Sequence, residues 1–284
     1  MLKKYLKLYP HYLAMAIKSK LVYRLDAMLG IIGFFFSNGA TFLSLYLALS
    51  SIGGLGKWSF FHIIFLYGFL MIPMGIDHMF TDRLWNYGGW MIHAGELDRI
   101  LMKPLNPLFQ MCAEFFQEGG IGEIVLGVIF IAISAPQITI TVSFSSVMAL
   151  IIGVIFSSLI YFAIKLATMS VAFFARRSVG LMSALYNVKD FGRYPGTIYH
   201  ESPMKFFGTV FYNVLLFLLP FGLVGYLPVS CILFPDDPIP LLWFSIPANS
   251  WLVCGIIAAV SLLHFFLAYA FFRKGLKRYG SAGS

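Results

Sequence analysis

The sequence predicts an all-α polytopic membrane protein with six transmembrane helices, and three observations predict it. First, 60% of the 284 residues are hydrophobic and only 11% are charged, whereas soluble domains average about 25% charged residues. Second, the chain holds several long stretches without Asp, Glu, Lys or Arg. Third, the basic residues gather on alternate connections between these stretches. Together these features exclude a soluble globule and indicate that lipid is the solvent.

Five uncharged stretches are each long enough for a helix of ~20 apolar residues to cross a bilayer. The third of them, residues 124–164, is long enough for two crossings, and the turn signal Ala135-Pro136-Gln137 divides it. Helices are predicted because the runs are too long for barrel strands and because a helix satisfies its own backbone in lipid. The predicted spans are residues 27–50, 59–79, 117–135, 146–174, 206–227 and 248–272.

An amphipathic helix is predicted before the first span, over residues 1–26. Its lysines, with His11, fall on one arc of a helical wheel, and apolar side chains such as Leu6 and Leu13 fall on the opposite arc. Such a helix lies in the membrane interface. A secretory signal peptide does not fit, because the segment has no apolar core of about seven residues. The helix is either a plain membrane anchor or takes a direct part in the function.

The basic residues orient the chain in the membrane. Of the 20 Lys and Arg residues, all but Lys57 and Lys165 fall before the first span, in the long loops at about 80–116 and 175–205, or in the tail at 273–284. By the positive-inside rule, both termini and these two loops are predicted to be cytoplasmic. Topology also explains the net charge of +8, because a nucleic-acid partner would need a solvated basic face that this chain lacks.

Motifs for catalysis, cofactors or metals are missing from the sequence. The pair Gly56-Lys57 is not a phosphate loop, because Ser51 stands where the first Gly is needed and Trp58 stands where Ser or Thr is needed. The histidines are scattered over different segments, and the three cysteines are far apart. We therefore expect no cofactor and no enzymatic activity in this chain.

The most informative segment is the run from Gly95 to Gln110 in the first long loop. Leu97 and Leu101 stand at helical spacing beside charged residues, and two prolines end the pattern. A short amphipathic helix is predicted here, held at the membrane surface. It is either an ordinary interfacial helix or a docking element for a cytoplasmic partner.

At this run the chain resembles the permease subunits of the ABC-2 class of ATP-binding cassette exporters. The resemblance rests on Lys103-Pro104-Leu105-Asn106-Pro107-Leu108, on Arg193-Tyr194-Pro195 in the second long loop, and on the layout of the whole chain. It implies a multi-pass protein of the bacterial inner membrane that pairs with a second permease and with a separate ATP-binding subunit, which holds the ATP and Mg²⁺.

The resemblance further implies that the two long loops act as coupling helices against the ATP-binding subunit. If the first one docks in a groove of that subunit, its apolar side is the buried anchor and its charged residues form the rim. The residues assigned to this contact are Glu96, Leu97, Asp98, Arg99, Leu101, Arg193 and Tyr194.

Few charged residues are expected inside the membrane. Glu118 and Glu123 begin the third span, and Lys165 lies late in the fourth. If these spans form a hairpin, Lys165 comes level with Glu114 and Glu118, where a structural ion pair or a snorkelling lysine is favoured over a proton relay. Because an ATP site and the usual ion-coupling residues are missing, the energy for transport must come from a partner.

Several polar residues are candidates for a translocation path. Most of them lie on or beside one small, polar face of the first span, and one lies in the fifth span next to an expected kink at Pro220. Helix packing is the alternative role, because small residues let helices approach closely in lipid. The candidates are Ser37, Asn38, Thr41, Ser44 and Asn213.

The outer loop at about 228–247 is rich in proline, which breaks it into short pieces. It is either a pair of half-inserted segments that form an extracellular gate, as in the resembled family, or a rigid surface loop.

Two other functions stay open beside a permease. A self-contained secondary transporter or channel would be expected to show paired acidic residues within the membrane, and a polytopic membrane enzyme would be expected to show clustered His or Asp at one interface. Neither pattern is visible in the sequence. The substrate and the identity of the second permease are not encoded in any motif.

Overall fold

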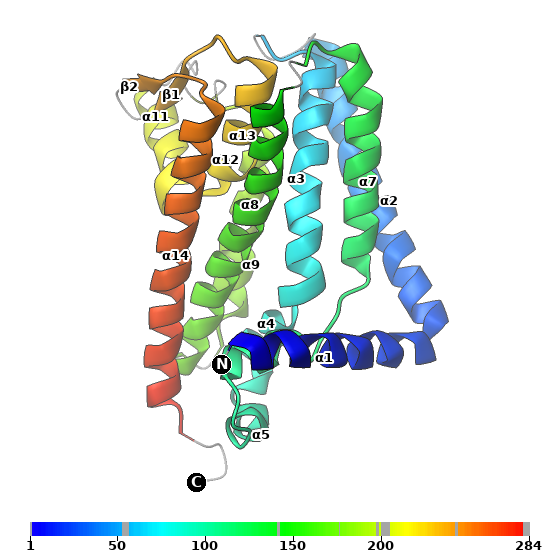
Figure 1. The fold of residues 1–284 in the computed structure, drawn as a ribbon, viewed down its shortest axis with the longest axis vertical. Helices are drawn as coiled ribbons and strands as arrows, with labels where there is room; N and C mark the ends of the chain where they lie inside the picture. Colours follow the sequence, from blue (N-terminus) through cyan, green and yellow to red (C-terminus); the bar gives the residue numbers. More distant parts are fainter. Residues whose placement is uncertain are drawn as a thin grey trace.

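The computed structural model describes residues 2–52, 57–140, 143–175, 177–196, 199, 205–241 and 244–280. Long helices stand side by side in one bundle, and a single helix lies across one end of it (Figure 1). That helix is α1, Leu2–Val22, and a turn at Tyr23 joins it to α2, Arg24–Ile52. The crossing of α1 over the bundle is the arrangement expected of an interfacial helix.

The two ends of the bundle are distinct. We call the end that carries α1 the α1 end. The opposite end carries a small antiparallel pair of strands, β1, Ile239–Leu241, and β2, Phe244–Ile246, and we call it the β end (Figure 1). This strand pair is the one departure from the predicted all-α class among the described residues.

Four further long helices form the body of the bundle: α3, Phe60–Thr81, α7, Gly119–Ser134, α8, Phe144–Ser170, and α14, Ser250–Arg278. With α2, they are long and apolar enough to cross a membrane. The predicted spans 27–50, 59–79, 117–135, 146–174 and 248–272 are therefore confirmed as helices, with ends shifted by a few residues.

Glycines bring α3 and α7 into backbone contact. A Cβ added to Gly68 would lie 2.8 Å from the Gly127 carbonyl oxygen, and one added to Gly75 would lie 2.6 Å from the Gly120 carbonyl oxygen. Only glycine fits such close approaches, and small residues are what helices use to pack tightly in lipid. α3 is consequently the most enclosed span, with 72% of its apolar window buried, whereas the window of α2 is 6% buried.

Short helices join α3 to α7 at the α1 end. They are α4, Arg83–Asn86, a π-helical turn η1, Tyr87–Met91, and then α5, Glu96–Leu101, and α6, Pro107–Ala113. At the other end of α7, η2, Ala135–Gln137, turns the chain towards α8 at the predicted turn signal.

The segment after α8 corrects the predicted topology. It contains η3, Val171–Phe173, then α9, Val179–Val188, and η4, Lys189–Arg193. Three contacts place it along α3: Tyr186 bonds Asp77, Lys189 approaches Met74, and Arg193 lies over the Tyr67 ring. Positions 77 and 67 lie about 15 Å apart along the helix axis. The prediction that residues 175–205 form a cytoplasmic loop is thus wrong, because residues 179–193 run inside the bundle, along α3, towards the β end.

The predicted fifth span is broken. α11, Lys205–Asn213, and η5, Val214–Leu218, are followed at Pro220 by α12, Phe221–Val224, and α13, Tyr226–Leu233. Residues 207–218 and 221–233 meet at an angle of 71°. The kink at Pro220 is confirmed. Both α11 and α13 lie towards the β end (Figure 1), which is the arrangement of a re-entrant pair. The α9–η4 segment runs along α3 inside the bundle instead.

Candidate functional site

The predicted coupling helix is present as α5, and it forms a short hairpin with α6, called here the α5–α6 hairpin. α5 follows Gly95, whose φ of 79° is a left-handed conformation that favours glycine. α6 starts with Pro107 and is capped by the Asn106 side chain, which accepts a hydrogen bond from the Phe109 N–H. The hairpin lies at the α1 end, where α5 extends beyond the ends of α3 and α7 (Figure 1).

The two apolar sides of α5 face different surroundings. Leu97 and Ile100 are fully buried and pack in an apolar cluster formed with α6, α8 and α14 of the same chain. Leu101 is 43% exposed and Met102 is 87% exposed. The expectation that Leu97 anchors a partner is therefore wrong, because its side chain fixes α5 to its own bundle. Leu101 keeps an exposed surface, as predicted for an anchor, and Met102 adds to it.

Ion pairs cover the polar side of the α5–α6 hairpin. The Arg99 guanidinium donates to both oxygens of Glu114, with Nη2–Oε2 at 2.8 Å, and Lys103 Nζ lies 2.9 Å from Glu114 Oε1. Glu96 lies 3.8 Å from Arg99. Partial burial raises the pKa of Glu114, but the hydrogen bonds from Arg99 and Lys103 outweigh burial and leave that pKa lowered.

Polar contacts attach the α5–α6 hairpin to the first and last helices. The Asn106 N–H donates to the Tyr5 hydroxyl of α1, and its side chain donates to the Tyr269 hydroxyl of α14, both at 3.0 Å. Asp98 lies beside Tyr279, just beyond α14. Burial and then the hydrogen bond and charge of Asp98 raise the pKa of Tyr279 to about 12. These contacts connect the hairpin directly to α1 and to the end of α14.

A buried ion pair joins α3 to α8 above this hairpin. Lys165 Nζ lies 2.7 Å from Asp77 Oδ2 and 2.8 Å from Asp82 Oδ1. Lys165 and Asp77 are 1% and 2% exposed. Asp77 also accepts a hydrogen bond from Thr81. Asp82 is the residue between α3 and α4, so Lys165 holds the point at which the chain leaves α3 for the α5–α6 hairpin.

The polar contacts continue from Asp77 to α7 and α9. The Tyr186 hydroxyl lies 2.8 Å from Asp77 Oδ2 and 2.9 Å from His78 Nε2. His78 Nδ1 lies 2.6 Å from Glu123 Oε2, and Glu123 Oε1 lies 3.5 Å from the Asn38 side chain of α2. We call the connected set the buried network. Its members are Asn38, Asp77, His78, Thr81, Asp82, Glu123, Lys165 and Tyr186.

The predicted partners of Lys165 are wrong. Glu114 belongs to the ion pairs of Arg99 and Lys103. Glu118 is paired instead with Lys20 of α1, at 2.9 Å. The predicted hairpin of the third and fourth spans compares only the depth of their residues along the bundle. The actual partners come from α3 and its end, and α3 packs against both α7 and α8.

The assignment of Arg193 and Tyr194 to a coupling loop is also wrong. The Arg193 guanidinium lies 5.3 Å from the centre of the Tyr67 ring and 2.9 Å from Asp190. Tyr67 is in the first half of α3, far from the α1 end where α5 lies. Because Tyr194 follows directly in sequence, it is also remote from the α5–α6 hairpin.

The predicted path residues do not share one surface. Asn38 is buried against α7, while Ser37 and Ser44 lie on the exposed side of α2. The Thr41 and Ser44 hydroxyls donate to carbonyl oxygens of their own helix at 3.0 Å. The side chain of Asn213 donates to the Thr209 carbonyl oxygen within α11, and α11 and α2 stand on opposite sides of the bundle (Figure 1).

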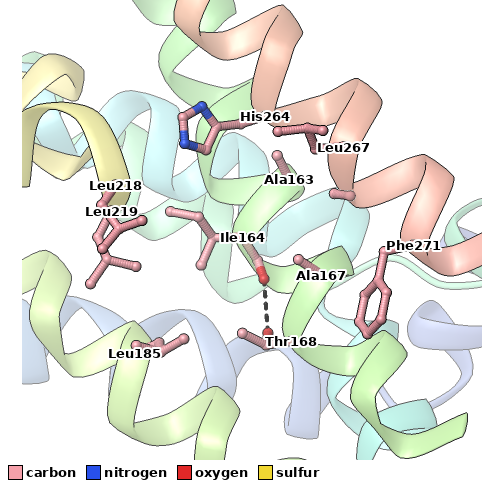
Figure 2. A pocket seen from close by; sticks show the side chains of 11 residues that line it. Ala163, Ile164, Ala167, Thr168, Leu185, Leu218, Leu219, His264, Leu267 and Phe271 are labelled. Atoms are coloured by element: carbon pink, nitrogen blue, oxygen red, sulfur yellow. Dashed lines mark hydrogen bonds between the residues drawn. The ribbon is translucent and has the colours of Figure 1, made fainter. Parts of the chain in front are cut away.

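An apolar cavity of about 300 Å³ opens between α8, α9, η5 and α14 (Figure 2). Leu185, Leu218 and Phe271 are among the side chains around it. His264 and Thr168 are its polar members, and both bond carbonyl oxygens of their own helices at 2.8 Å. The cavity can receive an apolar group, but its lining offers no group of residues suited to catalysis.

The chain has five helices that are long and apolar enough to cross a membrane, and one bent helix pair beside them. The family model described as ABC-2 family transporter protein matches residues 35–283. The chain belongs to the ABC-2 transporter family. It is therefore a permease component of a transporter and a multi-pass membrane protein, and its family works with an ATP-binding subunit. No curated protein and no solved structure gives a significant match.

The buried network of this ABC-2 permease contains residues that the sequence analysis missed. Asp77 and His78 fall inside the predicted span 59–79, and Tyr186 falls in what was predicted to be a loop. A charge within a predicted span is itself a signal of function. Asp77 directly follows the uncharged stretch that ends at Ile76, so its charge reads as the end of a span and not as a charge within it. Asp77 and Glu123 are not paired with each other, because Asp77 contacts Lys165 and Glu123 contacts His78.

Metal-ligating side chains are scattered in the described part of the ABC-2 permease. No group of three or more His, Cys, Asp or Glu side chains is placed there to hold a metal ion. The three cysteines, all of them described, are free.

Proposed function

We propose that this chain is one permease half of an exporter, which forms the translocation path with a second permease and is driven by a separate ATP-binding subunit that holds ATP and Mg²⁺. One observation carries the proposal: α5 extends beyond the bundle with Leu101 and Met102 exposed, while Leu97 and Ile100 fix it to the permease. A helix that is firmly attached on one side and apolar on the other is suited to docking in a groove.

The α1 end faces the cytoplasm in this proposal, and the protein lies in a bacterial inner membrane with both termini inside. The distribution of charge supports it. Lys189 and Arg193 lie within the bundle. Lys205 begins α11, which lies towards the β end, and Lys57 is at the β end, joined to Asp237 at 2.5 Å. The basic residues at the α1 end are Lys3, Lys4, Lys7, Lys18, Lys20, Arg24, Arg83, Arg99, Lys103, Arg177, Arg273, Lys274, Lys277 and Arg278. This asymmetry follows the positive-inside rule.

The second permease is proposed to pack along α2. The apolar window of this helix is 6% buried within the chain, and Gly33 and Gly39 have no neighbour within 4 Å of an added Cβ. Ser37, Thr41 and Ser44 then line the path between the two permeases. Asn38 and Asn213 are not part of this surface.

The re-entrant pair is proposed to form the extracellular gate. α13 is buried along its whole length, and Tyr212 of α11 donates to the Pro240 carbonyl oxygen in β1 at 3.1 Å. The pair is therefore hydrogen-bonded to the strands at the β end. In the proposed orientation, this end of the bundle faces outward.

The docking role of α5 is tested with Leu101→Ala combined with Met102→Ala. Truncated interface anchors typically cost ~2 kcal/mol or more, about a thirtyfold loss of affinity. We expect the ATP-binding subunit to be lost on co-purification and transport to stop, while the permease still inserts. Trp251→Ala with Leu252→Ala is the control, because these exposed apolar residues lie at the β end of α14. Normal co-purification and transport in the α5 variant would reject the docking role.

A further inference from the structure

The buried network holds ionisable groups deep in the bundle, and its hydrogen bonds restrict which atoms carry protons. Asp77, Glu123 and Lys165 are each at most 2% exposed. In such a buried site, two acceptor atoms that face each other without a proton between them are strongly unfavourable. The proton positions can therefore be deduced step by step from the donors and acceptors.

The first step concerns Asp77. Its Oδ2 lies 2.7 Å from the Lys165 ammonium, which can only donate. Asp77 Oδ2 is therefore an acceptor. The Tyr186 hydroxyl, 2.8 Å from the same oxygen, must then point its single proton at Asp77.

The second step concerns His78. Because the only proton of the Tyr186 hydroxyl is already directed to Asp77, the hydroxyl oxygen can only accept from His78 Nε2 at 2.9 Å. Nε2 therefore carries a proton. In a neutral imidazole the other nitrogen, Nδ1, is then an acceptor.

The third step concerns Glu123, whose Oε2 lies 2.6 Å from His78 Nδ1. An ionised carboxylate is an acceptor only, so a neutral His78 and an ionised Glu123 would face each other without a proton. One further proton must lie between them, either on an imidazolium beside a carboxylate or on a carboxylic acid beside a neutral imidazole. Both forms contain the same number of protons, so the proton belongs to the pair.

We propose that the His78–Glu123 pair is a proton-binding site within the membrane domain, and that the bound proton holds α3, α7 and α9 together. Loss of this proton places two lone pairs 2.6 Å apart and breaks the connection from α7 to α9 through His78 and Tyr186. The site goes beyond the exporter proposal, because it requires neither ATP nor the ATP-binding subunit.

The surroundings of the pair contain charges of both signs. Asp77 on α3 contacts Tyr186, and Lys165 on α8 and Asp82 at the end of α3 reach the pair through Asp77. From η4, Lys189 Nζ lies 4.0 Å from the centre of the Tyr186 ring. From α2, the uncharged groups Asn38 and Phe34 approach Glu123 and His78. These neighbours remain in place in a variant that alters Glu123 alone.

The test compares wild type, Glu123→Gln and Glu118→Gln as full chains in phosphatidylcholine nanodiscs, with thermal unfolding followed at several pH values. In this proposal the folded pair binds one proton between His78 Nδ1 and Glu123 Oε2, and unfolding separates the two side chains that share it. The folded state then binds more protons, so stability falls as pH rises, by up to a tenfold change in the unfolding equilibrium per pH unit.

We expect this alkaline decline in wild type and in Glu118→Gln, whose carboxyl pairs with Lys20 outside the network. In Glu123→Gln the amide can donate to His78 Nδ1 without a bound proton, so the decline should be absent. Equal slopes in all three proteins would overturn the proposal.

Nitrogen NMR of histidine-labelled wild type gives a readout that does not depend on the folding of any variant. At neutral pH we expect His78 either as an imidazolium or as the neutral Nε2–H form with an infrared band from a protonated carboxyl. A neutral Nδ1–H form, or a neutral Nε2–H form without that carboxyl band, would contradict the proposal.

Discussion

Two sets of ion pairs lie near the α1 end of the permease, and they differ mainly in their access to solvent. In the buried network, the Lys165 and Asp77 side chains are both 0% exposed. On the α5–α6 hairpin, the Arg99 side chain is 49% exposed and that of Glu114 is 15% exposed. Similar N–O distances of 2.7 and 2.8 Å therefore have different energetic consequences. When one partner of a buried pair is removed, the other is left as an uncompensated buried charge. When one partner of an exposed pair is removed, water solvates the remaining charge.

The largest effect is expected from Lys165→Met, which leaves Asp77 and Asp82 without their shared cation. Breaking a buried pair in this way typically costs about 3 to 5 kcal/mol. We expect a large fall in the thermal unfolding temperature of the permease in nanodiscs. Lys103→Met is the matched control, because Lys103 pairs with Glu114 on the hairpin, where the two side chains are 37% and 15% exposed.

The comparison is sharpened by adding Asp77→Asn to Lys165→Met. The amide removes the buried negative charge, so part of the lost stability should return. If Lys165→Met were no worse than Lys103→Met, or if Asp77→Asn restored nothing, burial would not be what separates the two sets.

A smaller effect is expected from Tyr186→Phe, which keeps the ring and removes the hydroxyl between Asp77 and His78. Leaving buried groups without a partner costs about 1 to 3 kcal/mol. Tyr199→Phe is the control, since its hydroxyl donates only to the Phe191 carbonyl oxygen near the surface. Unfolding temperatures should fall more for Tyr186→Phe, and equal shifts would count against the network as a connected unit.

The sequence predicted the helical spans that are continuous and apolar, because hydropathy measures what a crossing helix needs. It misplaced the fifth crossing for the same reason. Lys189, Asp190 and Arg193 interrupt that segment, and a window average treats each charge as solvated. In the structure Arg193 pairs with Asp190 and lies on the Tyr67 ring. Asp190 is three residues away, but Tyr67 comes from a distant part of the chain and is invisible to a local pattern.

The candidate site was predicted in part, and the limits have a physical cause. Helical spacing correctly predicts α5, but it cannot tell which of two apolar directions faces the chain's own core. It therefore predicts Leu97 as an anchor for the partner, although Leu97 is buried in its own chain. The buried network depends on α3, α7, α8 and α9 meeting at one level, which spacing along the chain does not encode. The local signs of it in the sequence are the charged residues inside predicted spans, Asp77, Glu123 and Lys165.

The smallest effect is expected at the hairpin, from Arg99→Gln or Glu114→Gln. Exposed pairs contribute about 0 to 1 kcal/mol, and salt screens them. Because the pKa of Glu114 is lowered in the folded state, its contribution is present above the unfolded value of about 4.3 and is lost as pH falls through the lower folded value.

Melting curves of wild type and Glu114→Gln should therefore differ slightly at neutral pH in low salt and converge in high salt or below about pH 4. The curves of Lys165→Met should stay apart from wild type in high salt, because ions do not reach a side chain that is fully enclosed. A salt-dependent loss at Lys165, or a salt-independent loss at Glu114 as large as that of Lys165→Met, would reverse the contrast between the two sets. Either result would mean that solvent access differs from the burial seen in the structure.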